Sequence, residues 1–287
     1  MVAGLVTEGQ ARAGASGTAD PLVLSHFCVR DATFEQRVRA ARSAGLDEIG
    51  LSSASFEAIV AGGADPADLS RVLTRNGVHV TELEVLRPWA FNERGRAAAV
   101  AAERTMLEMA ELFGARYLQV IGPFSGTLDD AAEVFAGLCD RVAEVGLVAG
   151  IEFLPFTNIP DAAVALAIVE RADRANGGVC VDAWHFFRGA ADWEMLEALP
   201  PNRIAAVQIC DGTSSPENPE YLADCLENRR VPGEGEFDLP AFLRVLDKRP
   251  ASVHVSIEVI SSELDRLPPE VAVRRMVEAT RATLAQT

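Results

Sequence analysis

The sequence predicts an α/β fold, a single (β/α)₈ barrel in which eight parallel strands alternate with helices. Two observations favour this fold: glycine-containing breaks recur every 31 to 37 residues, and eight strand-like segments fit into the chain after position 20. Such spacing is typical of βα units, because two parallel strands need a crossover helix between them. The five breaks are Gly45, Gly77, Gly114, Gly146 and the group Asn176-Gly177-Gly178.

The elements follow in order along the chain. Thr33 and Gln36 form a capping-box pattern that predicts a helix running to Ala44, and the acidic residues after Leu128 predict the start of another. Further helices are expected around 161–172, 240–247 and 270–284. Strands are expected at 22–28, 46–51, 78–86, 115–121, 147–154, 179–184, 204–210 and 252–259. An open doubly wound sheet more often stops at roughly five or six strands, which favours the barrel.

The organisation indicates one domain. No Pro/Ser-rich linker divides the chain, so residues 21–287 are expected to form the barrel as a unit. Residues 1–20 lack the basic start and the sustained apolar run of a secretion signal, and they are expected to form a flexible tail.

Composition excludes several classes of partner. Lys and Arg total 26 against 42 Asp and Glu, which gives a formal net charge of −16. Such a charge repels phosphate backbones and anionic membranes, so neither nucleic acid nor a membrane is an expected partner. Five widely spaced cysteines without a C-x-x-C motif favour reduced thiols in a cytoplasmic protein.

Four predicted strands end in the same pattern. Glu152, Asp182, Gln208 and Glu258 each follow an Ile or Val, and the residue two positions earlier is small: Gly150, Cys180, Ala206 or Ser256. Because side chains alternate along a strand, each polar residue shares the inward face with its small neighbour. Three carboxylates and an amide then meet at the barrel mouth, an oxygen-rich set that favours Mg²⁺ or Mn²⁺. The alternative is a set of rim residues that only hydrogen-bond to loops.

Longer segments resemble a known family. They are IEFLPF (151–156), VDAWHFFRGA (181–190), VQICDG (207–212), RRVPGEGEFDL (229–239) and VSIEV (255–259). They resemble the sugar phosphate isomerase/epimerase family, a group of xylose isomerase-like TIM barrels that includes ketose 3-epimerases, hydroxypyruvate isomerase and inosose dehydratase. Endonuclease IV is a distant relative, but its zinc cluster needs more than the four histidines of this chain. The resemblance covers about Leu22 to Leu284 and is most specific in the second half.

The resemblance implies a site. Glu152, Asp182, Gln208 and Glu258 would hold one divalent cation, Mn²⁺, Mg²⁺ or Co²⁺, and His185 and Arg230 would bind substrate. Gln208 stands where the well-studied epimerases have histidine, and a neutral amide oxygen is a weaker ligand than imidazole.

Further residues are candidates by position. His26 and Glu84, at predicted strand ends, and Trp184 are expected substrate contacts; for Trp184 the alternative is packing against helices. Asp211 is expected to orient a ligand, or else simply to start a loop. Arg188 is expected to support the site, or else to pair with a loop carboxylate. The long loop 212–230 is expected to be a functional lid or an oligomer contact, the alternative being a disordered excursion.

The implied function is that of a metal-dependent isomerase or epimerase of a sugar or related keto-polyol. Glu152 and Glu258 would exchange a proton beside the carbonyl through an enediolate that the cation stabilises. One alternative is a dehydratase of a keto-inositol or dehydroshikimate-like compound on the same site. The other is a non-catalytic carbohydrate-binding barrel. The resemblance also makes a homo-oligomer an expectation.

Overall fold

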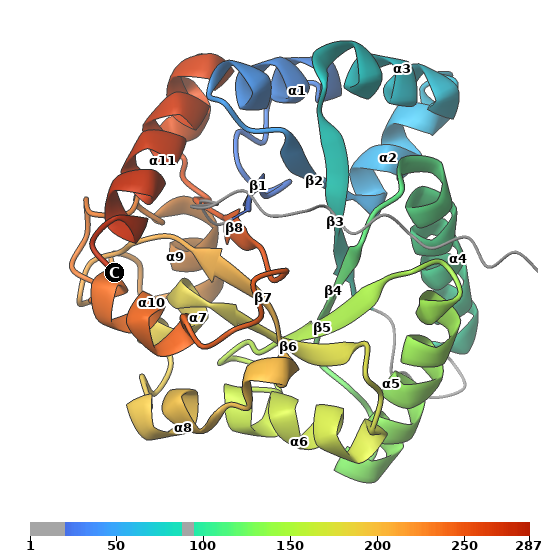
Figure 1. Cartoon of the computed structure of the whole chain (residues 1–287), viewed down its shortest axis with the longest axis vertical. Helices are drawn as coiled ribbons and strands as arrows, with labels where there is room; N and C mark the ends of the chain where they lie inside the picture. Colours follow the sequence, from blue (N-terminus) through green and yellow to red (C-terminus); the bar gives the residue numbers. More distant parts are fainter. Residues whose placement is uncertain (1–20, 88–94) are drawn as a thin grey trace, which may run out of the picture.

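The computed structural model describes residues 21–87 and 95–287, so the tail predicted for residues 1–20 lies outside the described part. Eight parallel strands close into a barrel in chain order, and pairing of Leu24 with Ile257 joins the first strand to the last. The predicted (β/α)₈ barrel is therefore confirmed (Figure 1). The strands are β1 Leu22–Leu24, β2 Glu48–Ser52, β3 His79–Leu86, β4 Tyr117–Ile121, β5 Val148–Glu152, β6 Gly177–Asp182, β7 Ile204–Ile209 and β8 Val255–Ile257.

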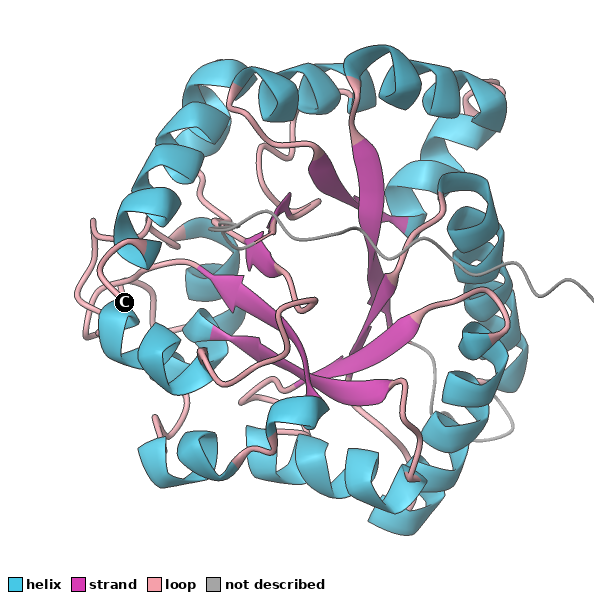
Figure 2. Cartoon of the chain, in the orientation of Figure 1, coloured by secondary structure: helices cyan, strands magenta, loops and turns pink. Residues whose placement is uncertain are grey.

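Helices form an outer ring around these strands (Figure 2). They are α1 Phe34–Ser43, α2 Ser53–Ala61, α3 Pro66–Asn76, α4 Arg96–Phe113, α5 Leu128–Ala143, α6 Ala162–Ala172, α7 Ala183–Arg188, α8 Trp193–Ala198, α9 Tyr221–Glu227, α10 Leu239–Leu246 and α11 Pro269–Leu284. The capping box of Thr33 and Gln36 begins α1 as the sequence predicts. No helix of the described ranges is both long and apolar enough to cross a membrane.

Four of the predicted glycine turns are present. Gly45, Gly77, Gly114 and Gly146 all adopt positive φ angles between 61° and 78°, just after helices. The fifth predicted break is wrong, because Gly177 and Gly178 lie inside β6. The left-handed residue after α6 is Asp173. Glycine is needed at 178 for a different reason, since a Cβ atom there would lie 2.7 Å from the Cβ atom of Ala205 on the next strand.

Two segments near the barrel mouth differ in part from expectation. The strand-like segment 179–184 continues to Trp184, but β6 ends at Asp182, as the strand-end pattern predicts. The Asp182 carboxylate accepts hydrogen bonds from the backbone N–H groups of Trp184 and His185, which caps α7 at once. Within the 212–230 segment the chain forms α9 instead of a structureless loop.

The predicted alternation of faces is confirmed on β5 to β8. Ile151, Val181, Val207 and Ile257 belong to the apolar core between strands and helices. Cys180 and Ala206 pack with Tyr117 in a separate small cluster. The polar residues that follow at the strand ends therefore point into the barrel mouth.

We expect Gly150→Ala to lower the free energy of unfolding by about 1–3 kcal/mol, because the close-packed barrel interior cannot accept the extra methyl group. The new Cβ atom would approach Cε2 and Cζ of Tyr117 to 2.7 and 2.9 Å. Urea unfolding measures the change. Gly137→Ala is the control: it lies within α5 and meets only the flexible Arg141 guanidinium, so stability should stay equal or rise. Equal stability of Gly150→Ala and wild type would contradict the packing argument.

Candidate metal centre and active site

The candidate site lies where β5 and β6 end. Glu152 is the last residue of β5, Asp182 is the last residue of β6, and His185 is in the first turn of α7. All three are buried, and one donor atom from each lies within 4.8 Å of the others. A strand end followed directly by a helix thus supplies two of the three donors from one short segment.

Glu152 is held by two neighbours. Its Oε1 lies 3.2 Å from Nε2 of His185, and its Oε2 accepts a hydrogen bond of 2.6 Å from Nε2 of Gln119 on β4. On the other side of the imidazole ring, Nδ1 lies 2.8 Å from the Tyr221 hydroxyl of α9. The orientation of the Glu152 carboxylate is therefore fixed by β4, α7 and α9 together. The sequence interpretation did not single out Gln119 or Tyr221.

A buried arginine joins the other two carboxylates. Nη1 of Arg229 donates to Oδ2 of Asp182 and to Oε2 of Glu258, each at 2.8 Å. The Arg229 side chain is only 2% exposed, and its remaining N–H groups contact the carbonyl and the thiol of Cys225. One guanidinium thus neutralises two carboxylates that would otherwise repel each other across a buried space.

The pKa values of Asp182 and Glu258 are shifted in opposite directions. Burial by itself would raise the pKa of Asp182, but Arg229 and His185 outweigh it and hold that pKa below its usual range. Burial raises the pKa of Glu258 well above its usual range, with Asp182 and Glu152 adding to the effect and Arg229 opposing it. Glu258 is therefore the member of the pair that carries a proton more readily.

Gln208 lies level with Asp182 on the neighbouring strand. It pairs in register with Asp182 on β6 and with Ser256 on β8, two residues short of Glu258. Its Oε1 accepts from the thiol of Cys180 at 3.3 Å, and its Nε2 is buried without a hydrogen-bond partner among the described residues. The same Oε1 lies 3.4 Å from Nε2 of Gln119, which also donates to Glu152, so Gln208 lies next to the Glu152, Asp182 and His185 cluster.

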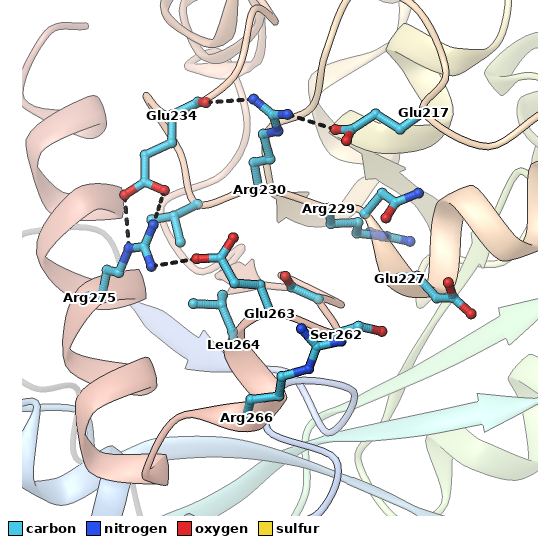
Figure 3. Close-up of a pocket in the computed structure, with 13 residues that line it drawn as sticks. Glu217, Glu227, Arg229, Arg230, Glu234, Ser262, Glu263, Leu264, Arg266 and Arg275 are labelled. Atoms are coloured by element: carbon cyan, nitrogen blue, oxygen red, sulfur yellow. Dashed lines mark hydrogen bonds and ion pairs between the residues drawn. The ribbon is translucent and has the colours of Figure 1, made fainter.

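The two adjacent arginines face opposite ways. Arg230 is 40% exposed, and its guanidinium pairs with Glu217 and reaches the Glu234 carbonyl in an outer cleft of about 520 Å³ (Figure 3). Backbone bonding between Arg230 and Asp211 holds this segment extended, so Arg229 points inward. The sequence shows that one of the two must face the barrel, but not which one. Arg230 was expected to bind substrate; in the structure it lines the outer cleft, whereas Arg229 lines the mouth pocket described below.

Asp211 and Arg188, which were expected to support the site, hold nearby loops and helices in place. The Asp211 carboxylate accepts backbone N–H groups of Gly233 and Phe237, which fixes the P-G-E-G loop. Arg188 pairs with Asp224 of α9 at 3.1 Å and lies over the Trp184 ring at 4.5 Å. Trp184 is fully buried and packs against Phe237, away from the mouth pocket described below.

Glu84 lies on β3, and His26 lies in the turn that follows β1. Glu84 is buried, accepts from the Ser25 hydroxyl at 2.9 Å and from the His26 backbone N–H at 2.8 Å, and burial next to Glu82 raises its pKa well above the usual range. The Ser25 hydroxyl also lies 3.3 Å from Oε1 of Glu258. Glu84 therefore approaches the site through Ser25. The buried Nδ1 atom of His26 has no partner among the described residues.

We expect His26 to make folding stability fall in acid. Burial, with a contribution from Arg37, lowers the pKa of His26 from 6.5 to about 3. Between these values the unfolded chain binds a proton that the folded chain does not, so its stabilising effect is present above pH 6.5 and is lost as pH falls toward 3. Unfolding free energies of wild type and His26→Asn at several pH values measure it. A difference that stays constant through this window would contradict it.

A divalent cation fits the donor set. Glu152, Asp182 and His185 offer two carboxylate oxygens and an imidazole nitrogen at compatible distances. Asp182 already accepts two backbone N–H groups and Arg229, and Arg229 also holds Glu258. A cation at this cluster would therefore share Asp182 with a fixed positive charge, which weakens its binding without blocking it.

A pocket of about 120 Å³ opens above these groups. Glu152, His185, Arg229 and Glu258 line it together with side chains from the ends of the first strands and from α9. Two carboxylates, an imidazole and an arginine thus converge at the C-terminal end of the parallel barrel. This arrangement places the protein in the class of (β/α)₈ enzymes.

Comparison with known proteins gives the family. The model of the xylose isomerase-like TIM barrel family matches residues 38–283, and the chain belongs to this family. The predicted family resemblance is thereby confirmed.

Two curated relatives are similar in sequence. An inosose isomerase of Bacillus velezensis is 25% identical over 204 residues, which cover 68% of this chain and 71% of the relative. A 3-dehydroshikimate dehydratase of Pseudomonas aeruginosa is 28% identical over 222 residues, which cover 74% of this chain but only 33% of the relative. The prediction of an enzyme of the isomerase or epimerase kind agrees with the first relative.

A crystal structure of the IolI protein with a bound zinc atom has the same fold. It superposes with a TM-score of 0.83 at 20% identity and covers 92% of this chain and 98% of its own. Together with the Glu152, Asp182 and His185 cluster, it suggests a divalent metal here.

Proposed function

We propose that this protein is a divalent-metal-dependent isomerase or epimerase that moves a proton at a carbon next to the carbonyl of a small sugar or keto-polyol. The observation that carries the proposal is the cluster of Glu152, Asp182 and His185 on the floor of the mouth, with Glu258 lining the same pocket. The relatives named inosose isomerase support the same reaction class.

We infer distinct roles for the two glutamates. Glu152, held by Gln119 and His185, is positioned to take the proton from the substrate carbon. Glu258, whose pKa burial raises, is suited to return a proton. Return to the opposite face of the same carbon gives epimerisation, and return to the neighbouring carbon gives isomerisation. When bound, a divalent cation polarises the carbonyl oxygen and stabilises developing negative charge.

The donor set narrows the choice of cation. His185 adds an imidazole nitrogen to the carboxylates, whereas the amide oxygen of Gln208 already accepts from Cys180 and Gln119. Imidazole suits Mn²⁺, Co²⁺ and Zn²⁺ better than Mg²⁺. We therefore propose Glu152, Asp182 and His185 as the primary ligands, with Glu258 joining when Arg229 releases it.

Metal analysis combined with isotope exchange tests the function. The protein, purified without added metal, is analysed for bound elements and then melted with and without Mn²⁺, Co²⁺, Zn²⁺ or Mg²⁺. Keto-sugars and keto-inositols are next incubated with it in deuterated water. Deuterium uptake at the carbon beside the carbonyl without loss of water supports the proposal. If the protein contains no bound metal and no added metal shifts its melting temperature, the metal-dependent mechanism is excluded. That result would favour a non-catalytic carbohydrate-binding barrel.

A dehydratase is the second candidate. The raised pKa of Glu258 suits an acid that protonates a leaving hydroxyl group, and a 3-dehydroshikimate dehydratase is among the relatives. Water loss from such a substrate produces a new conjugated absorbance, which separates this reaction from proton exchange alone.

Three expectations remain as proposals: a single domain over residues 21–287, action in the cytoplasm and homo-oligomer formation. The outer cleft is lined by four arginines and four glutamates, so its balanced charge favours neither nucleic acid nor an anionic surface.

A further inference from the structure

Ser25 joins two buried glutamates at the barrel mouth. It directly follows β1, and its Oγ lies 2.9 Å from Oε2 of Glu84 and 3.3 Å from Oε1 of Glu258. The backbone N–H group of Phe27 donates to the same Oγ at 3.2 Å. A serine hydroxyl has one proton to donate and two lone pairs that accept. Ser25 can therefore donate to only one of the two glutamates, and the second bond forms only if the other glutamate donates.

The protonation state of Glu84 sets the direction of these bonds. An ionised Glu84 accepts the single Ser25 proton and leaves Oε1 of Glu258 without a donor from Ser25. A protonated Glu84 donates from Oε2 to Ser25, and Ser25 then donates to Glu258. Oε1 of Glu84 accepts the backbone N–H group of His26 at 2.8 Å, so Oε2 is the oxygen that remains for the proton. Only the protonated form lets all of these bonds exist at once.

The surroundings of Glu84 favour the protonated form. Burial raises the pKa of Glu84 well above its usual range and Glu82 adds to the effect, while hydrogen bonds and Arg37 oppose it. The Arg37 guanidinium donates to backbone carbonyls, among them that of Cys28. Two further titratable groups nearby are neutral, because burial lowers the pKa of His26 to about 3 and raises the pKa of Cys28 to about 12. No charge close to Glu84 therefore outweighs its burial.

The neighbouring strand leaves room for the Glu84 carboxylate. A Cβ atom at Gly50 of β2 would overlap Oε1 of Glu84 and would lie 3.0 Å from the backbone nitrogen of His26. The carboxylate thus occupies the space that any other residue at position 50 would fill, and it is fully buried there. Gly50 and His26 together hold Glu84 against Ser25.

Glu258 has a donor within reach of each oxygen. Nη1 of Arg229 donates to Oε2 at 2.8 Å, and Ser25 faces Oε1. A carboxyl group that exchanges a proton with substrate must keep its direction, and donors on both oxygens fix it. We propose that Glu84 is a positioning residue: as a neutral acid it turns the Ser25 hydroxyl toward Glu258 and so orients the Glu258 carboxylate. This inference rests on the proposed function and adds the support on which its acid depends.

Three variants of the full chain test the inference on the substrate that the exchange screen identifies. An amide at position 84 can accept from His26 and donate to Ser25, as the neutral acid does, so we expect Glu84→Gln to keep near-normal kcat. Glu84→Leu and Ser25→Ala should each lower kcat by about 10²-fold with KM little changed, because Glu258 loses its direction. The double variant should lose no more than either single variant, since both act through one chain of contacts.

Ser256→Ala is the matched control. The Ser256 hydroxyl donates to Oε2 of Glu82 at 2.7 Å, so a second buried serine–glutamate pair lies two residues earlier on β3. Its loss should lower the melting temperature as Ser25→Ala does, yet leave kcat near that of wild type. Three results would overturn the inference: an equal loss of kcat in Glu84→Gln and Glu84→Leu, near-normal kcat in Ser25→Ala, or a loss in Ser256→Ala as large as in Ser25→Ala.

Two further measurements decide the inference without turnover. The infrared difference spectrum of wild type minus Glu84→Gln at neutral pH should contain the carbonyl band of a protonated carboxylic acid. Crystal structures should show the Glu258 carboxylate unmoved in Glu84→Gln and turned away from Ser25 in Glu84→Leu. A missing band, or an unmoved Glu258 in Glu84→Leu, would overturn the inference. If wild type exchanges no proton on any keto-sugar or keto-inositol, the proposed function fails, whereas these two measurements still decide whether Glu84 orients Glu258.

Discussion

Glu258→Gln and Glu152→Gln are each expected to lower kcat by about 10²–10⁴-fold or more, on whichever substrate the exchange screen identifies. Glutamine keeps the shape of each side chain but can neither take nor give a proton at neutral pH. Because burial raises the pKa of Glu258, its amide replacement resembles the protonated acid and should leave the fold intact. Turnover measures the first effect, and circular dichroism with thermal melting measures the second.

Glu234→Gln is the matched control for these two variants. Glu234 pairs with Arg275 in the outer cleft, away from the mouth pocket, so its amide replacement should keep near-normal turnover. Turnover close to wild type in Glu152→Gln or Glu258→Gln would remove that residue from the acid/base role. A loss of activity with a large fall in melting temperature would instead indicate a structural role.

Arg229→Gln is expected to destabilise the metal-free protein by about 3–5 kcal/mol, because it leaves two buried carboxylates without their shared partner. The same substitution should tighten cation binding by about tenfold or more, since it removes a fixed positive charge beside Asp182. Urea unfolding without metal and calorimetric titration with Mn²⁺ measure these opposite effects.

Arg230→Gln is the control, with the same chemistry one residue away. Its partner Glu217 is 41% exposed, so losing this surface pair should change stability by only about 0–1 kcal/mol and leave cation affinity unchanged. If the two variants behave alike, the separation of a buried from an exposed arginine is wrong. Weaker cation binding by Arg229→Gln would show that Arg229 supports the cluster instead of competing with the cation.

The fold could be predicted because each local signal repeats. The glycine turns and the alternation around Ile151, Val181 and Val207 depend on backbone geometry within a few residues. The strand-end pattern predicted that β6 ends at Asp182, but not that the Asp182 carboxylate caps α7, because the sequence does not show that this side chain turns back on the backbone. The Asp182 carboxylate is also bonded to Arg229, which lies 47 residues further along the chain.

The candidate site was predictable only in part for the same reason. Strand-end position indicated Glu152, Asp182 and Glu258, since all strands of a parallel barrel end at one mouth. The contacts of the Gln208 amide oxygen with Cys180 and Gln119 depend on how neighbouring strands are placed, which no short pattern encodes. Gln119 and Tyr221 reach Glu152 and His185 from distant segments, so contacts that only the folded chain creates assign their roles.

Three cysteines near the candidate site are buried and free. Cys180 donates to Gln208, the Cys225 and Cys210 thiols lie 3.3 and 3.7 Å from Arg229 nitrogens, and burial raises the pKa of each of these thiols. In the folded protein they are therefore poor nucleophiles, and a thiol reagent reaches the fully buried Cys180 and Cys210 only when the barrel mouth opens. The rate at which these buried thiols are labelled therefore measures how often the mouth of the barrel opens. The measurement needs neither a substrate nor an introduced dye.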